Sequence, residues 1–69
     1  MTTREILRAV KCQHLSLHKG EGYWYFVFDN GVEYETKSVY AFRLNDLSFG
    51  AWVEEGLELI SDIEKRRAA

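Results

Sequence analysis

Apolar and polar residues alternate just before a run of six apolar residues, and this pattern predicts a first β-hairpin. Leu15 and Leu17 alternate with polar residues, as expected of a strand with one buried face. The following loop, Gly20-Glu21, begins with glycine, which suits a two-residue type II′ turn. With this turn Leu17 faces Trp24. Leu15 then faces Phe26, so apolar residues pair with apolar residues across the hairpin.

The turn sequence Asp-Asn-Gly permits two registers between the second and third strands. A two-residue loop would place Phe26 opposite Glu35. A three-residue loop, closed by Gly31 in the left-handed region, would place Phe26 opposite Tyr34. A one-residue slip moves all of a strand's side chains to the other face. We therefore predict the three-residue loop, because it keeps every glutamate off the aromatic face.

Residues near both ends of the chain have helical periodicity. Thr2, with a glutamate three residues later, has the spacing of a capping box. Ser48 is a favourable N-cap for a second helix, and basic residues 65–67 suit its negative end. This helix places on one arc Phe49, Trp52, Val53, Gly56, Leu59, Ile60 and Ile63. Glycine at position 56 costs up to about 1 kcal/mol, which predicts close approach to a large side chain such as Trp24.

These patterns predict an α+β fold with the order α-β-β-β-α, in which both helices pack on one face of a three-stranded antiparallel meander. The expected elements are a helix at about 3–11, strands at about 13–19, 22–28 and 32–42, and a helix at about 48–67. The length suffices for a single small domain over 1–69. Two paths remain open after Ser38: either Tyr40 and Phe42 continue the core pattern, or the strand bends there.

The alternation gives the sheet an inner and an outer face. The inner face is expected to contain Leu15, Leu17, Trp24, Phe26, Phe28, Val32 and Tyr34. The outer face is expected to present Tyr23, Tyr25 and Val27, rimmed by His18, Glu33, Glu35 and Lys37, with His14 and Ser16 beside them. A bare sheet face with two tyrosines is a candidate surface for binding a protein partner or a second copy of the chain. The competing interpretation is a solvated face, on which tyrosine is simply a good strand former.

The last helix carries an acidic stripe, formed by Glu54, Glu55, Glu58 and Asp62. Two pairs within it are like charges four residues apart, and each pair destabilises a helix by about 0.2–0.5 kcal/mol. A basic partner would relieve this repulsion, so the stripe is a second candidate partner surface. The small size of the effect favours a solvated face instead.

The chain has no catalytic or metal-binding motif with suitable spacing. Cys12 is the one cysteine, and on a shared strand face it would lie about 7 Å from His14, too far for a thiolate–imidazole hydrogen bond. His14 and His18 would lie about 13 Å apart, too far to share a metal ion. We therefore expect a non-enzymatic protein without a metal or cofactor.

Charge and hydropathy narrow the classes of partner and the cellular compartment that we expect. The net charge of −2 argues against a nucleic-acid binder, which usually has a basic face. The alternative function is nevertheless binding of nucleic acid by base stacking on Tyr23 and Tyr25. The cations available for it are Lys19, Lys37 and Arg43. No apolar run is long enough to span a membrane, the N-terminus is too charged for a signal peptide, and a lone thiol fits a reducing compartment, so we expect a cytoplasmic protein.

The order α-β-β-β-α resembles that of double-stranded-RNA-binding domains. Those domains begin their second helix with a lysine cluster, whereas Glu54 and Glu55 stand there in this chain, so RNA binding is not the first choice. The layout also resembles that of phage-encoded CRISPR inhibitors with acidic surfaces, for which a net charge of −2 is small.

A longer stretch, HKGEGYWYFVFDNGVEYETKSVYAFRLNDLSFGAWVEEG, looks like small uncharacterised proteins of bacterial phages and integrated mobile elements. This resemblance implies a bacterial cytoplasmic setting and no catalytic residue. The hypothesis from the sequence is a small non-enzymatic protein-interaction module that binds a protein partner or itself through the outer sheet face. Nucleic-acid binding or an acidic phage-type inhibitor is the alternative.

Overall fold

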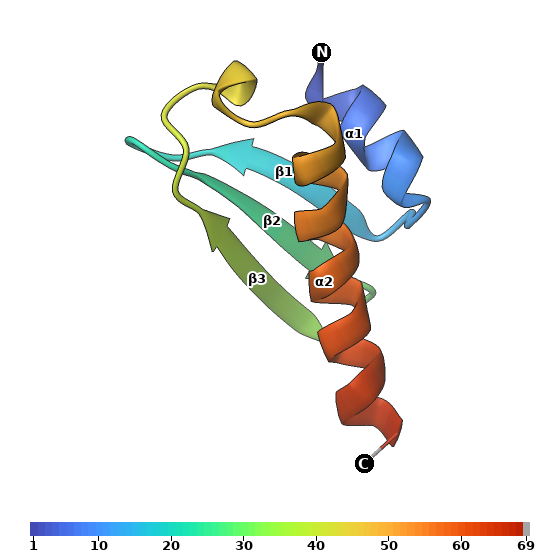
Figure 1. The fold of residues 1–69 in the computed structure, drawn as a ribbon. Helices are drawn as coiled ribbons and strands as arrows, with labels where there is room; N and C mark the ends of the chain where they lie inside the picture. Colours follow the sequence, from blue (N-terminus) through green and yellow to red (C-terminus); the bar gives the residue numbers. More distant parts are fainter. Residues whose placement is uncertain (69) are drawn as a thin grey trace.

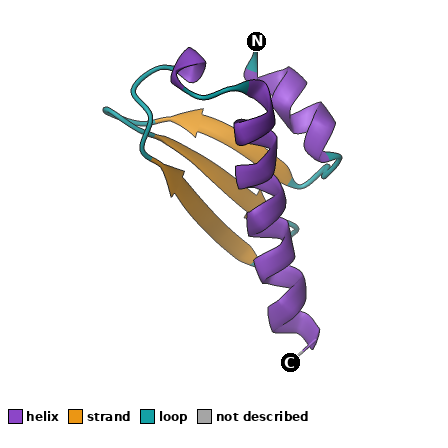
Figure 2. Ribbon diagram, viewed as in Figure 1, coloured by secondary structure: helices purple, strands orange, loops and turns teal. Residues whose placement is uncertain are grey.

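Helices α1 and α2 lie on one face of a three-stranded antiparallel sheet in the computed structural model, which describes residues 1–68 (Figures 1 and 2). In chain order the elements are α1 (Thr3–Val10), β1 (Leu15–Lys19), β2 (Trp24–Asp29), β3 (Tyr34–Val39), the short 3-10 helix η1 (Leu44–Asp46) and α2 (Phe49–Ala68). The strands are ordered β1-β2-β3 in the sheet. The predicted α+β class and α-β-β-β-α order are confirmed. Residue 69, the end of the predicted domain, lies outside the described residues.

Both helices begin at the predicted caps. The Thr2 side chain accepts a hydrogen bond from the Glu5 N–H at 3.2 Å. The Ser48 hydroxyl accepts one from the Ala51 N–H at 3.1 Å at the start of α2. Each cap satisfies a backbone donor that the helix itself leaves unpaired. Lys11 ends α1 in the left-handed region, with φ 61°, which turns the chain back toward the sheet.

The core lies between the inner face of the sheet and the two helices. Its buried apolar residues are Ile6, Val10, Leu15, Leu17, Phe26, Phe28, Val39, Ala41, Trp52, Leu59 and Ile63. The Trp52 ring lies edge-on to Trp24 and Phe26, with centroids 6.0 and 6.3 Å apart, an arrangement worth about 0.5–1.5 kcal/mol per pair. Its indole N–H donates to the Leu44 carbonyl at 2.7 Å. Trp52 therefore joins the sheet, η1 and α2 at one point.

The first hairpin has a different register from the predicted one but keeps its faces. Leu17 lies opposite Phe26, and Leu15 opposite Phe28, two residues away from the expected pairing. The turn closes when the Gly20 N–H donates to the Tyr23 carbonyl at 2.8 Å, and Gly22 takes φ 77°. Gly22 thus supplies the left-handed residue of the turn. Because a shift of two residues preserves the side-chain alternation, the predicted inner face of β1 and β2 is correct.

The second hairpin contradicts the predicted register. Phe26 lies opposite Lys37, three residues from the expected partner Tyr34, and Phe28 lies opposite Glu35. An odd shift moves every side chain of β3 to the other face. Val32 and Tyr34, expected in the core, are 91% and 65% exposed. The inner face of β3 instead carries Glu35 and Lys37 beneath α2, with Glu33 just before the strand.

Side chains in the turn explain this register. The Asn30 carboxamide oxygen accepts hydrogen bonds from the N–H groups of Val32 and Glu33, at 2.9 and 2.7 Å. The Asp29 carboxylate accepts from the Gly31 N–H at 3.0 Å, and Gly31 has φ 87°. Such Asx contacts favour a turn over a strand. They hold Gly31 and Val32 in the loop, so β3 starts later than predicted.

The path after β3 is resolved in favour of a bend. Val39 ends the strand and is buried, and the Ala41 N–H donates to the Val39 carbonyl at 2.9 Å in a tight turn. Tyr40 and Phe42 are exposed, so they do not continue the core pattern. The chain then crosses to η1 and α2 above the end of the sheet (Figure 1).

Gly56 allows close packing of α2, but against different residues from the one predicted. A Cβ at this position would lie 2.9 Å from Cγ2 of Val10 and 3.4 Å from Cε1 of Phe26, with Leu15 also in contact. Trp24 is not among these neighbours. The glycine therefore marks the point where α2 crosses α1 over the centre of the sheet.

We expect Gly56→Ala to destabilise the fold by about 1 kcal/mol, although alanine favours helices by up to about 1 kcal/mol, because overpacking a core typically costs about 1–3 kcal/mol. Gly50→Ala is the matched control, since no atom lies within 4 Å of a Cβ there. It should stabilise by about 0.4–1 kcal/mol. Urea unfolding measures both changes, and a stabilised Gly56→Ala variant would contradict the described packing.

Candidate interaction surface

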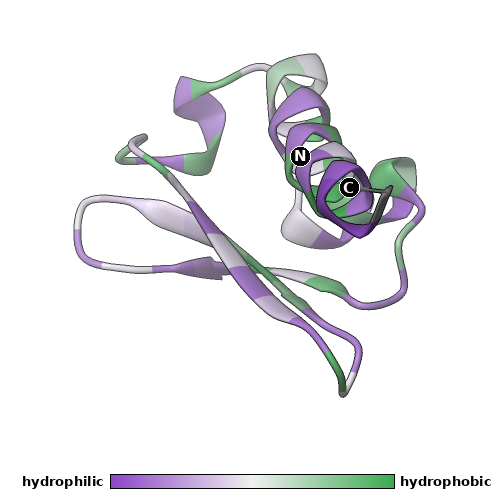
Figure 3. Cartoon of the chain, turned by 90° about the horizontal axis from the view of Figure 1, so that it is seen from below, coloured by the Kyte–Doolittle hydropathy of each residue, from purple (hydrophilic) through white to green (hydrophobic). Residues whose placement is uncertain are grey.

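The outer face of the sheet lacks a covering helix. Figure 3, seen from below, shows α1 and α2 on the opposite side of the strands. We use the name outer face for Ser16, His18, Tyr23, Tyr25, Val27, Asp29, Tyr34, Thr36, Ser38 and Tyr40. The register aligns His18, Tyr25 and Ser38 in one cross-strand row. Tyr23, Tyr25, Val27 and His18 thus lie on the face predicted for them.

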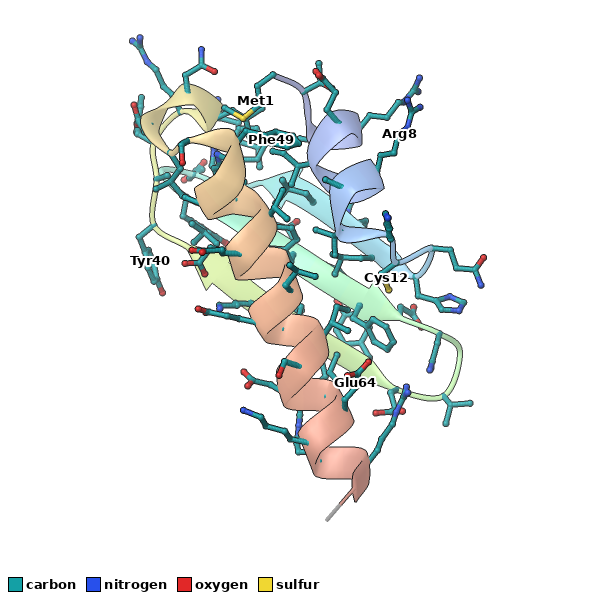
Figure 4. All side chains as sticks on the ribbon, turned by 45° about the vertical axis from the view of Figure 1, so that its right-hand side comes forward. Met1, Arg8, Cys12, Tyr40, Phe49 and Glu64 are labelled. Atoms are coloured by element: carbon teal, nitrogen blue, oxygen red, sulfur yellow. The ribbon has the colours of Figure 1, made fainter. Side chains whose placement is uncertain are left out.

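Four aromatic rings form a continuous row on this face. His18 stacks on Tyr25 with ring centroids 5.3 Å apart, Tyr25 lies 5.9 Å from Tyr23, and Tyr23 lies 6.3 Å from Tyr40. Tyr40, labelled in Figure 4, extends from the chain just after β3 and is 87% exposed. Tyr23 and Tyr25 are half-buried within the row, so they have less side-chain entropy to lose on binding than fully exposed rings.

Gly20 supports Tyr23, an interior ring of the row. A Cβ at this position would lie 2.5 Å from Cζ of Tyr23, so the tyrosine ring lies directly over the glycine backbone. At the His18 end of the row, the ring nitrogen Nε2 is 2.8 Å from the Ser16 hydroxyl. These contacts fix the positions of Tyr23 and His18 before any partner binds.

The outer face is almost uncharged. It contains neither lysine nor arginine, and Asp29 is its one carboxylate, already hydrogen-bonded to the turn. The rest of its polar groups are hydroxyls and the His18 imidazole. This composition differs from the predicted mixed aromatic and charged surface.

The prediction that Glu33, Glu35 and Lys37 rim the outer face is wrong. Glu35 and Lys37 lie on the inner face of β3, Glu33 directly precedes the strand, and all three pair with α2. Arg67 Nε donates to Glu33 Oε1 at 2.7 Å, and Arg66 Nη1 donates to Glu35 Oε1 at 2.5 Å. Lys37 Nζ lies 2.6 Å from Glu58 Oε2 and 3.0 Å from Glu55 Oε2. Opposite charges on α2 explain why these side chains tolerate the inner face.

The same contacts divide the predicted acidic surface. Glu55 and Glu58 pair with Lys37, whereas Glu54 and Asp62 are exposed. The repulsion expected within the stripe is therefore partly relieved inside the chain. Binding of a basic partner there stays a prediction.

Two cations in these contacts have raised pKa values. Burial lowers the pKa of Lys37, but hydrogen bonds to Glu58 and Glu55 and their negative charges outweigh it, so the pKa of Lys37 lies above its ordinary value of 10.5. A hydrogen bond to Glu35 raises the pKa of Arg66. Both shifts favour the charged forms that hold α2 against β3.

We expect the contribution of Lys37 to stability to be complete below about pH 10.5 and to disappear as the pH rises through its raised folded-state pKa. Lys37→Met should therefore lower the free energy of unfolding by a few tenths to about 1 kcal/mol at pH 8. Urea unfolding of both proteins should show this difference shrinking above pH 10.5. A difference that is independent of pH would show that the ammonium charge is not responsible.

A cavity of about 320 Å³ lies between α2 and the turn after α1. Cys12 and Glu64, labelled in Figure 4, line it together with His14, Phe28, Asn30, Ile60, Ile63 and Arg67. The His14 ring lies edge-on to Phe28, with centroids 6.0 Å apart. His14 was expected beside the outer face, but its ring lies against the inner-face residue Phe28 instead. Among the described residues no hydrogen bond links Cys12 to His14, and such a contact is what a thiolate–imidazole pair requires.

Over residues 1–68, no group of three or more histidine, cysteine, aspartate or glutamate side chains could hold a metal ion. No helix in this range has the length and apolarity to cross a membrane. Comparisons with protein-family models, with curated proteins and with solved structures found no match to the chain. The geometry of the outer face is therefore the basis for inferring a function.

Sequence reasoning missed Tyr34, Thr36, Ser38 and Tyr40 as members of the outer face. The signal was present in the alternation of charged and uncharged residues along β3, read together with the cations at 66–67. These cations can neutralise Glu33 and Glu35 only if the two glutamates face the helix.

Proposed function

We propose that this chain is a non-enzymatic protein-interaction module that binds a protein partner through its outer face. In this proposal it acts in a bacterial cytoplasm, in the phage or mobile-element setting that its sequence resemblance implies. The single observation that carries the proposal is the row of aromatic rings on a sheet face that no helix covers.

The chemistry of the outer face supports a protein as the partner. Tyrosine provides a large contact area with few rotatable bonds, and hydroxyls and imidazole provide adaptable hydrogen bonds. Cores of protein interfaces are enriched in aromatic residues and depleted of charged ones. The outer face has both properties, because β3 turns its charges toward α2.

Nucleic-acid binding is less well supported by the geometry. Glu33 and Glu35 no longer stand beside the tyrosines, which removes one objection. However, Lys37 is bound to Glu55 and Glu58 on the other side of the sheet. Stacking would then have only Lys19 and Arg43, which are not members of the outer face, for contacts with the phosphates, and such contacts supply most of the affinity for nucleic acids.

An acidic inhibitor is also less well supported. The carboxylates of Glu33 and Glu35 are matched by arginines, and those of Glu55 and Glu58 share Lys37. The acidic surface that would imitate DNA is thereby reduced to isolated side chains such as Glu54.

Photo-crosslinking tests the proposal directly. The photoreactive residue p-benzoylphenylalanine replaces Tyr40 at the exposed end of the ring row, or Leu57 on α2 as the control position. Both positions are exposed. In a bacterial extract we expect a defined protein to be crosslinked from position 40 but not from position 57.

The crosslinked protein is then purified, and its affinity is measured by calorimetry. Tyr25→Asp should weaken binding by about tenfold or more, because it places a charge at the centre of the row. The matched variant Leu57→Asp should leave binding unchanged. Circular dichroism must show that both variants are folded. Equal losses from the two variants, or oligonucleotide binding at low salt that depends on Tyr25, would overturn the proposal.

A further inference from the structure

Strand β3 forms an open edge of the sheet. Over the described residues, no further strand pairs with it on the side away from β2, and Figure 1 shows no other segment along that side. The strand is six residues long, its pairing with β2 is regular throughout, and the chain contains no proline. Bulges and prolines usually protect such edges from pairing with another strand. Neither is present in β3. Its inward-pointing charged residues, Glu35 and Lys37, also discourage pairing unless a second strand opposes each with the opposite charge.

The backbone groups available at this edge can be identified. The Asn30 N–H donates to the Glu33 carbonyl, so this pair is a hydrogen-bonded one. Hydrogen-bonded and non-hydrogen-bonded pairs alternate along an antiparallel ladder. The N–H and C=O groups of Tyr34, Thr36 and Ser38 therefore point away from β2, toward the open edge.

The side-chain alternation restricts how a second copy could pair there. Directly opposed residues point to the same face, so inner-face residues must meet inner-face residues. In a symmetric antiparallel pair, an axis at Glu35 would oppose two carboxylates, and an axis at Lys37 would oppose two ammonium groups. An axis at Thr36 instead places Glu35 of each copy opposite Lys37 of the other copy. It also places Tyr34 of each copy opposite Ser38 of the other. The N–H and C=O groups that these residues point toward the open edge can then bond to each other across the two strands.

We propose that two copies of this chain associate through their β3 edges, antiparallel, about a two-fold axis at Thr36. The complementary pairing of Glu35 with Lys37 of the second copy selects this register. The two sheets then form one continuous sheet with all helices on one face. This proposal concerns the strand edge and does not depend on the outer face as a binding surface.

The same register extends the aromatic surface. Ser38 lies opposite Tyr25 in the sheet and would lie opposite Tyr34 of the second copy on its other side. Tyr34, which is 65% exposed in the single chain, would then lie in the same cross-strand row as Tyr25 and His18. Association thus joins two outer faces into one surface.

Charge-reversal variants test the register by sedimentation velocity over a wide concentration range. We expect the wild-type protein to dimerise. Glu35→Lys would oppose two lysines, and Lys37→Glu would oppose two glutamates, so each alone should dimerise about tenfold more weakly or not at all. A mixture of the two variants restores both opposite-charge pairs and should form heterodimers.

Glu33→Lys is the matched control. It makes the same charge change as Glu35→Lys and also breaks an ion pair with α2. The side chain at position 33, however, would face the apolar Val39 of the second copy. It should therefore still dimerise. Loss of dimerisation in this control would show that the ion pairs to α2, rather than the proposed register, are responsible.

A disulfide provides an independent test. Opposed residues of a hydrogen-bonded pair have Cα atoms about 5.5 Å apart, within the range that a disulfide spans. In a Cys12→Ser background, Thr36→Cys should crosslink two copies under mild oxidation, whereas Ser38→Cys, which faces Tyr34, should not. A wild-type monomer at every concentration, or equal crosslinking at both positions, would overturn the proposal. Dimerisation that is lost in Tyr25→Asp but kept in Glu35→Lys would place the self-contact on the outer face instead.

Discussion

The contact between the charged side of β3 and α2 determines which surfaces this protein offers. Arg66 and Arg67 meet the glutamates of the strand, and Lys37 meets the acidic residues of the helix. Exposed ion pairs of this kind are individually weak. Their consequence is geometric, because an alternating strand that turns charges inward must turn its uncharged residues outward. The uncharged outer face follows from this orientation, and so do the charges that a second strand at the edge of β3 would have to match.

The helices could be predicted because apolar residues recur at helical spacing behind clear caps. The strand order and the inner face of β1 and β2 could be predicted because large apolar residues alternate there without ambiguity. Phe26 and Trp52 are fully buried, as their positions in the two patterns indicate. An error of two residues in the first register did not change the faces. The local pattern therefore sufficed wherever burial was determined by apolar side chains.

The face of β3 could not be predicted by the same rule. Placing glutamates away from aromatic rings is reasonable for a strand considered alone, but their partners Arg66 and Arg67 lie some thirty residues further along the chain. The turn added a second constraint, since Asn30 binds two backbone N–H groups and delays the start of the strand. Tyr34 and Thr36 were consequently placed on the wrong side, and the candidate surface was given charges that it does not have.

Nuclear Overhauser contacts between α-protons across β2 and β3 test the orientation of β3 most directly. In non-hydrogen-bonded antiparallel pairs the two Cα atoms lie about 4.5 Å apart, which brings their α-protons into close contact. The described register predicts strong contacts between Val27 and Thr36 and between Tyr25 and Ser38. Contacts that instead pair Val27 with Glu33 would return the glutamates to the outer face and contradict the account.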